Sequence, residues 1–220
     1  LIEQDKVGGT CLHRGCIPTK APLHAGEVAD SARESHLFGV NATLNSIDIN
    51  GVNTYKDGVI AGLYKGLQGL IKSRNVTFIE GKGRLVNNNT IEVNGQQITG
   101  KNIVLATGSY AKTIPGLDID GQRVITSDHG TKLDYIPKSA IVLGGGVIGC
   151  EFASVWKSFG VDVTIIEGLN HLVPLEDESS SKLLERAYRK RGINFELGIK
   201  FKSHRVNPDS VTVTLEDGRE

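Results

Sequence analysis

Ile141-Val142-Leu143-Gly144-Gly145-Gly146-Val147-Ile148-Gly149 is the segment from which the fold class of this chain can be inferred. A short apolar run, typical of a buried strand, leads directly into the pattern G-x-G-x-x-G and then into a helical pattern. A second apolar run follows and ends at the acid Glu167. Strand, glycine turn, helix and acid in this order indicate a dinucleotide-binding βαβ unit. A purely structural turn is the alternative, because G-x-G-x-x-G alone is weak evidence.

The order of the glycines predicts what each position does. In such a unit the first glycine forms the turn, the second lets a pyrophosphate approach, and the third packs helix on strand. Glu167 is expected to bond the ribose hydroxyls and to repel a 2′-phosphate. None of residues 168–171 is an arginine that would bind this phosphate, so the sequence favours NAD over NADP. The predicted NAD-binding residues of the turn are Gly144, Gly145, Gly146, Val147, Ile148 and Gly149.

The apolar periodicity on either side of this turn predicts an α/β protein. Downstream, we expect strands at 140–143, 161–167, 193–197 and 211–215, with helices at 147–159 and 177–191. Upstream, we expect helices at 16–37 and 52–73 and short strands at 76–80, 83–86, 90–93 and 101–106. Pro22 predicts a kink or a weakened first helix. Gly58, Gly62 and Gly66 repeat every four residues, which indicates either a close backbone approach or simply a weak helix.

Composition excludes several classes of protein. The 25 basic and 25 acidic residues balance, which argues against binding to nucleic acid or to a membrane surface. No apolar run has transmembrane length, and no signal peptide is visible. Three cysteines suit a reducing compartment, so we expect a cytoplasmic protein. The chain has no methionine and opens on a strand-like end, Leu1-Ile2-Glu3, so we expect a piece of a longer protein.

A second motif contains two of the cysteines: Gly8-Gly9-Thr10-Cys11-Leu12-His13-Arg14-Gly15-Cys16-Ile17-Pro18-Thr19-Lys20. The pair can reach disulfide geometry if the first lies at the mouth of a helix and the second one turn inside it. A helix N-terminus also favours the reactive thiolate. Two alternatives stay open. One is a metal site made by Cys11, His13 and Cys16, which lacks a fourth ligand; the other is a pair of structural core cysteines.

This motif resembles the active site of the flavin-dependent pyridine nucleotide-disulfide oxidoreductases, most closely the branch that oxidises dihydrolipoamide, and the resemblance covers essentially the whole chain. In that family two Rossmann-like domains hold FAD and NAD. The resemblance therefore implies a partial FAD-binding domain over 1–115, a linker over 116–138 and a C-terminally truncated NAD-binding domain over 139–220, together with a small β-meander.

The resemblance also implies roles for single residues. Cys11 and Cys16 would form the redox disulfide, with Cys16 facing the flavin and Cys11 exchanging with the dithiol substrate. Lys20 would lie near flavin N5 and also contribute to FAD binding, and Glu151 would lie beside the nicotinamide, where the two could pair. Cys150 is expected to be a small packed residue. The remaining implied contacts are Glu3 to the FAD ribose, Gly83 to the FAD adenine, Thr107, Gly108 and Ser109 along the flavin, and Phe201 to the NAD adenine.

The implied function is oxidation of protein-bound dihydrolipoamide through the disulfide and FAD, with reduction of NAD⁺ to NADH. The implied partners are the lipoyl domains of 2-oxo acid dehydrogenase complexes and a second subunit, joined through a C-terminal domain outside this chain. The rivals are another disulfide reductase, of the mercuric or glutathione reductase kind, and a non-catalytic NAD-binding fragment. The first FAD glycine motif and the catalytic His-Glu pair would also lie outside, so we expect these 220 residues alone to be inactive.

Overall fold

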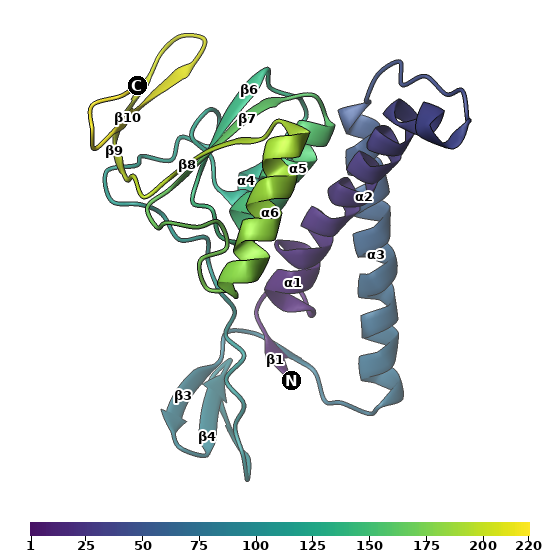
Figure 1. The fold of residues 1–220 in the computed structure, drawn as a ribbon. Helices are drawn as coiled ribbons and strands as arrows, with labels where there is room; N and C mark the ends of the chain where they lie inside the picture. The colour runs from purple at the N-terminus through teal and green to yellow at the C-terminus, as the bar shows by residue number, and fades with distance from the viewer. The chain divides into compact units, whose positions relative to one another are not determined.

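The computed structural model describes residues 1–220, and its contacts divide the chain into two compact units (Figure 1). Unit 1 comprises residues 1–18 and 57–110, and unit 2 comprises residues 19–56 and 111–220. Helices alternate with parallel strands in the chain, which confirms the predicted α/β class. None of the helices is both long and apolar enough to span a membrane.

Unit 1 contains two small sheets. β1 (Ile2–Glu3) pairs in parallel with β2 (Ile79–Glu80). The second sheet is the predicted meander, in which β3, β4 and β5 are antiparallel neighbours. Asn94 and Gly95 both have positive φ between β4 and β5, as a tight two-residue hairpin requires. The remaining elements that lie wholly in this unit are α1 (Gly9–His13), β3 (Arg84–Asn87), β4 (Thr90–Val93) and β5 (Gln96–Thr99).

The strand predicted at 101–106 is wrong. β5 forms earlier instead and pairs with β4 from Thr90↔Thr99 to Val93↔Gln96. Residues 101–110 have no strand neighbour, and Val104 and Leu105 are 87% and 65% exposed. An apolar run becomes a strand only when a neighbouring strand satisfies its backbone groups, and the described residues provide none here.

The residues of two long helices are divided between the two units. α2 (Cys16–Arg33) continues through Pro22 without interruption and is followed by the 3₁₀-helix η1 (Ser35–Phe38), close to the predicted end of this helix.

α3 (Ile49–Ser73) begins three residues before its predicted start, because Asp48 Oδ1 accepts a hydrogen bond from Asn50 N at 3.0 Å. No atom lies within 4 Å of a Cβ placed on Gly58, Gly62 or Gly66, so no backbone approaches them.

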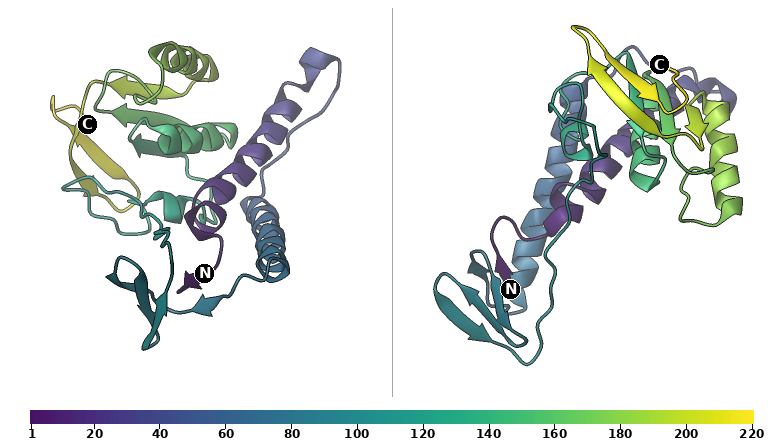
Figure 2. Two further views of the ribbon diagram at one scale, coloured as in Figure 1. Left: turned by 90° about the horizontal axis from the view of Figure 1, so that it is seen from below. Right: turned by 90° about the vertical axis from the view of Figure 1, so that its left-hand side faces the viewer.

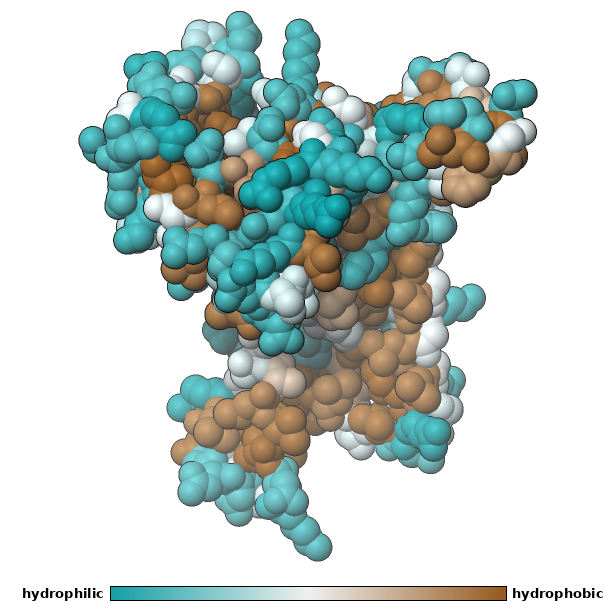
Figure 3. Space-filling view, viewed as in Figure 1, coloured by the Kyte–Doolittle hydropathy of each residue, from teal (hydrophilic) through white to brown (hydrophobic).

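Exposed apolar side chains gather in unit 1. Figure 3 shows hydrophobic atoms over the meander and along the lower part of α3. Leu63 and Leu70 of α3 are 47% and 52% exposed, and Leu85 of β3 is 48% exposed. The apolar periodicity of α3 is therefore present in sequence but is not matched by burial within this chain.

Unit 2 is built on a three-stranded parallel sheet in the order β6-β7-β8. Its strands and helices confirm the predicted βαβαβ series, and Gly192 ends α6 with a left-handed φ of 71°, as predicted for its cap. Two elements were not predicted: the single-turn helix α4 (Ser127–Gly130) and the strand β9, whose sequence is mostly polar. The main elements are β6 (Ser139–Leu143), α5 (Val147–Ser158), β7 (Asp162–Glu167), α6 (Glu178–Arg191), β8 (Asn194–Leu197), β9 (Phe201–Val206) and β10 (Val211–Leu215).

The main core lies where α5 and α6 cover this sheet. Val163 and Ile165 of β7 and Ala153 of α5 are fully buried, and Tyr188 of α6 donates a hydrogen bond to the carbonyl of Cys150 at 2.7 Å. A smaller cluster joins β7 to the antiparallel hairpin β9–β10 through Ile166 and Val213. Figure 2 shows this hairpin in yellow beside the green strands of the sheet. The glycine turn is thus anchored between a buried sheet and a buried helix.

The part of α2 that belongs to unit 2 packs along α5. A Cβ added to Gly26 would lie 2.9 Å from Ser158 Cβ, so the two helices are nearly in backbone contact there. One turn further, Asp30 accepts hydrogen bonds from Ser158 Oγ at 2.6 Å and from Arg191 of α6 at 3.2 Å. α2 is therefore held against the helix that follows the glycine turn.

Candidate functional site

The glycine turn has the geometry that its motif predicts. Gly144 follows β6 with φ +109°, a conformation that side chains rarely adopt. Gly146 is the N-cap of α5. A Cβ on Gly149 would lie 1.9 Å from the carbonyl oxygen of Gly144, so only glycine lets α5 begin this close to the turn. The first and third glycines are therefore required by backbone geometry.

The turn also leaves room for a ligand. No atom lies within 4 Å of a Cβ placed on Gly144 or on Gly146. The N-terminus of the 12-residue helix α5 begins at this open space and presents unpaired N–H groups. A pyrophosphate group fits such a site, because amide donors and the helix dipole both favour negative charge.

Glu167 ends β7 beside this turn. Its Oε2 accepts a hydrogen bond from Gly145 N at 2.7 Å, and its Oε1 accepts one from Leu169 N at 2.8 Å. A Cβ on Gly145 would lie 2.7 Å from Leu172 Cδ2, so the middle position of Gly-Gly-Gly also needs glycine. This second role of the acid, fixing the turn, was not apparent from the motif. Each carboxylate oxygen retains acceptor capacity for a ribose hydroxyl.

The predicted pairing of Lys20 with Glu151 is confirmed. Lys20 Nζ of α2 donates to Glu151 Oε1 of α5, and the two side chains are 55% and 24% exposed. Glu151 lies two residues after Gly149, the third glycine of the turn. The ion pair therefore places the Lys20 ammonium beside the first turns of the helix whose N-terminus forms the proposed phosphate site.

The two motif cysteines occupy two different helices. Cys11 lies in α1, and Cys16 is the first residue of α2. The expected arrangement is thus corrected: the second cysteine, and not the first, lies at the mouth of the long helix. Both side chains are exposed thiols, which argues against two structural core cysteines. A Cβ on Gly15 would lie 3.2 Å from the carbonyl oxygen of Thr10 and 3.6 Å from Cys11 Cα, so the chain folds back tightly between the cysteines.

The metal alternative for this motif has little support. His13, its third donor, has Nε2 at 2.9 Å from the carbonyl oxygen of Val7, and its ring contacts Tyr64 edge-on. No group of three or more His, Cys, Asp or Glu side chains in the structure is arranged to hold a metal ion.

Apart from Lys20, which belongs to unit 2, the residues expected to bind FAD lie in unit 1, in two places. Glu3 Oε1 accepts hydrogen bonds from the amides of Gln4 and Asp5, and the adjacent Ile2 lies 3.4 Å from a Cβ placed on Gly83. Gly108 has φ +83°, and its Cβ position is 3.6 Å from Thr10 Oγ1, next to Cys11. The structure therefore brings Glu3 near Gly83, and Gly108 near the cysteine motif. Thr107 and Ser109, on either side of Gly108, are exposed.

Two further predicted residues pack inside unit 2. Phe201 begins β9 and is half-buried against the cluster formed by Ile166, Val213 and Leu215. Cys150 is 4% exposed, which confirms it as a small packed residue. Its Sγ donates to the carbonyl oxygen of Gly145 at 3.3 Å, and burial raises the pKa of the thiol to about 11.

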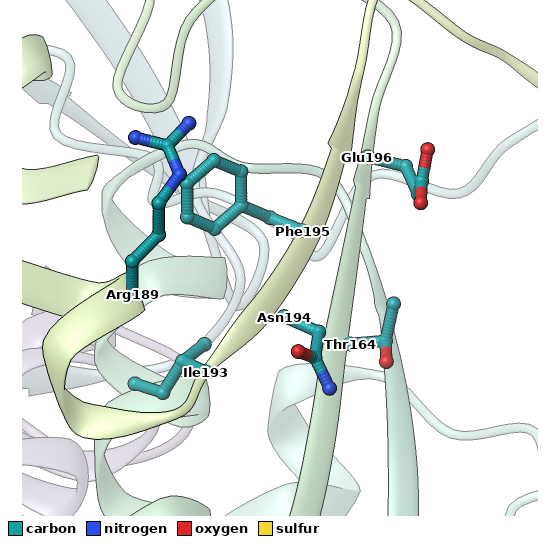
Figure 4. Close-up of a pocket in the computed structure, with 6 residues that line it drawn as sticks. All are labelled: Thr164, Arg189, Ile193, Asn194, Phe195 and Glu196. Carbon is teal, nitrogen blue, oxygen red and sulfur yellow. The ribbon is translucent and has the colours of Figure 1, made fainter. Parts of the chain in front are cut away.

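A separate pocket of about 480 Å³ lies on the edge strand of the parallel sheet (Figure 4). The guanidinium of Arg189 stacks over the ring of Phe195 at 4.5 Å from its centroid. None of the predicted site residues lines this pocket. Its lining residues are Thr164, Arg189, Ile193, Asn194, Phe195 and Glu196.

Known proteins resemble this chain along its whole length. Dihydrolipoyl dehydrogenase from Bacillus subtilis is 39% identical over 99% of the chain, which spans 48% of that relative. Among solved structures, LpdA from Mycobacterium tuberculosis matches with a TM-score of 0.86 and 25% identity, covering 99% of this chain and 49% of its own. The HOCl-induced flavoprotein disulfide reductase RclA from Escherichia coli matches with a TM-score of 0.77 and 29% identity. The match covers 98% of this chain and 47% of the RclA chain.

The chain therefore spans about half the length of the relatives that it matches. The sequence pattern of a single family extends over all of residues 1–220, and it includes both the cysteine motif and the glycine turn. On this evidence, the chain belongs to the pyridine nucleotide-disulphide oxidoreductase family.

Proposed function

We propose that the protein is an NAD-dependent flavoprotein that oxidises protein-bound dihydrolipoamide to lipoamide. The observation that carries this proposal is the Lys20–Glu151 ion pair, which joins the helix that begins at Cys16 to the helix that begins at the glycine turn. The similarity to dihydrolipoyl dehydrogenase supports the same substrate. The overall reaction converts dihydrolipoamide and NAD⁺ into lipoamide, NADH and a proton.

The cysteines would carry out the thiol exchange. In the oxidised protein, a dithiol substrate would attack the Cys11–Cys16 disulfide at Cys11, whose side chain is exposed in α1. Loss of the second substrate thiol proton would close the product disulfide and leave both cysteines reduced. The N-terminus of α2 would favour the thiolate of Cys16, which lies one turn before Lys20 on the same helix.

The other proposed residues would bind and orient the cofactors. FAD, when bound, would accept two electrons from the reduced cysteine pair and deliver them as hydride to NAD⁺. Glu3, Gly83, Thr107, Gly108 and Ser109 would contact FAD, within a domain over 1–115. Within a domain over 139–220, Gly144–Gly149 would hold the NAD pyrophosphate, Glu167 the ribose and Phe201 the adenine. Lys20 would be oriented toward the flavin by Glu151.

We further propose that the protein is a homodimer. Its substrate would be the dihydrolipoamide carried by the lipoyl domains of a 2-oxo acid dehydrogenase complex. A disulfide reductase with another substrate is the rival, and the flavoprotein RclA illustrates that class. The two differ in the thiol compound that they accept, since both would carry flavin and a redox pair.

The test uses the full-length protein and three measurements: its visible spectrum, NADH formation with dihydrolipoamide, and NADH oxidation with an artificial dye. We expect a flavin band and turnover with dihydrolipoamide. Cys11→Ser and Cys16→Ser should each abolish dihydrolipoamide turnover but retain transfer from NADH to the dye, which bypasses the disulfide. A flavin band without dihydrolipoamide turnover would favour the rival reductase, and absence of flavin would contradict both.

A further inference from the structure

Lys200 lies close to the end of β7, where Glu167 is proposed to bond the ribose, although Lys200 comes much later in the chain. The segment after β8 folds back along the end of β7: Ile199 N donates to the carbonyl oxygen of Glu167 at 3.2 Å, and Gly198 N donates to that of Leu169 at 2.9 Å. As a result, Lys200 Cγ lies 3.2 Å from the position of a Cβ on Gly168, the residue directly after the acid. All these residues belong to unit 2.

Hydrogen bonds hold the backbone of Lys200 in place, whereas its ammonium group has no partner in the protein and can contact a ligand. The carbonyl oxygen of Lys200 accepts a hydrogen bond from Glu216 N at 3.0 Å, which ties this segment to the end of β10. Its side chain is exposed and forms no ion pair or hydrogen bond within residues 1–220. A flexible four-carbon stem can therefore carry the charge over Gly168 toward a ligand.

A positive charge beside Gly168 would act on the 2′ group of the adenosine ribose, which is a hydroxyl in NAD(H) and a phosphate in NADP(H). In this fold an acid at the end of the second strand favours a free 2′-hydroxyl, whereas a nearby cation accommodates a 2′-phosphate. Residues 168–171 contain no arginine or lysine. Because Gly168 has no side chain, the stem of Lys200 occupies the space that a side chain there would fill, and it supplies the cation from another segment.

We propose that Lys200 is a specificity-determining residue that lets the nucleotide site accept the 2′-phosphate of NADP(H), more weakly than NAD(H), in spite of Glu167. This inference rests on the proposed NAD site at Gly144–Gly149. Glu167 keeps NAD(H) the preferred ligand because it bonds free ribose hydroxyls and repels a phosphate. Lys200 offsets part of that repulsion by pairing with the phosphate, which is a salt-dependent interaction.

The experiment measures dissociation constants of NADH and NADPH by fluorescence titration of the full-length protein at low and high salt. The variant is Lys200→Gln. The matched control is Lys202→Gln, which removes the same charge from an exposed lysine two residues later. For Lys200→Gln at low salt, we expect NADPH affinity to fall about fivefold and NADH affinity to change less than about twofold. Lys202→Gln should alter neither affinity by more than that.

Two outcomes would overturn this inference while leaving the proposed function intact. One is unchanged NADPH affinity in Lys200→Gln. The other is an equal loss in both variants, which would mean a diffuse positive field instead of a contact at the ribose. If the unmodified protein bound neither NADH nor NADPH, the proposed nucleotide site itself would be wrong, and the inference would fail with it.

Discussion

Among single residues, Gly145 and Gly149 of the turn at Gly144–Gly149 have no room for a side chain, because an added Cβ would lie less than 3 Å from another atom of the protein. The carbonyl oxygen of Gly144 occupies the space beside Gly149, and Leu172 occupies the space beside Gly145. Glu167 then bonds the amide of Gly145 from the next strand. A methyl group added at position 145 or 149 would therefore move backbone or core atoms, and the proposed nucleotide-binding surface would move with them.

Gly149→Ala tests this contact. Its Cβ would meet the Gly144 carbonyl at 1.9 Å, so α5 must move away from the turn. We expect the free energy of unfolding to fall by about 2 kcal/mol or more, measured by urea denaturation, together with loss of NADH binding. Gly62→Ala is the control, because open space surrounds it in α3; it should raise stability by roughly 0.5–1 kcal/mol. Equal stability of Gly149→Ala and the unmodified protein would contradict the contact.

The buried thiol of Cys150 should make the free energy of unfolding depend on pH in the alkaline range. Burial raises the pKa of this thiol from an ordinary 9.0 to about 11. Above pH 9 the unfolded chain loses this proton while the folded protein keeps it, so the free energy of unfolding falls as pH rises. The contribution, roughly 2–3 kcal/mol, is complete below pH 9 and is lost between pH 9 and 11.

The measurement for Cys150 is urea denaturation at several pH values from 8 to 11 with Cys150→Ala as the comparison. The variant lacks the titrating thiol, so its stability should fall less steeply over this range than that of the unmodified protein. Identical slopes would show that the thiol does not contribute.

At the scale of elements, polar contacts hold α2 against α5 and α6. Asp30 of α2 accepts hydrogen bonds from Ser158 of α5 and Arg191 of α6, and Arg191 also donates to Ser154 Oγ at 2.6 Å. The Lys20–Glu151 pair lies further along the same two helices, α2 and α5. A network that joins three helices restrains their relative position more than any one exposed ion pair does.

Asp30→Ala should loosen this network. It leaves Arg191 and Ser158 without their shared acceptor, and we expect a loss of about 1 kcal/mol in the free energy of unfolding. The measurement is urea denaturation at low and high salt, and the difference from the unmodified protein should shrink as salt screens the charges. Glu34→Ala, just after α2, is the control, since no ion pair or side-chain hydrogen bond of Glu34 is present. A larger effect of Asp30→Ala at high salt would contradict this account.

At the scale of the whole molecule, the chain contains backbone that its own strands do not pair. Residues 101–110 have apolar side chains suited to a strand, yet they form none. The chain spans about half the length of the relatives that it matches, and within residues 1–220 no strand pairs with this segment.

Amide hydrogen exchange tests the state of this segment. In the 220-residue chain, amides of residues 103–110 should exchange near the rate of an unprotected peptide. Those of β7, at the centre of the parallel sheet, should be at least about a hundredfold slower. Protection of residues 103–110 in this chain would mean that they pair within it, contrary to the structure.

The α/β class, the βαβαβ series and the glycine turn could be predicted from the residue pattern, whereas the Lys20–Glu151 pairing was predicted only from the resemblance to a known family. These features depend on apolar periodicity, on glycines that backbone geometry requires, or on a motif with a narrow range of conformations. Local sequence was less informative for β9, which is mostly polar, and misleading for the apolar segment 101–106.

Which distant segments lie side by side could be seen only in the folded protein. It showed that Glu167 fixes the turn through Gly145 and that Cys16 begins α2 while Cys11 lies in α1. It also placed Lys200 over Gly168. The physical reason is that a strand needs a partner and a side chain meets distant residues only after the chain has folded back, and neither condition can be seen in a local pattern.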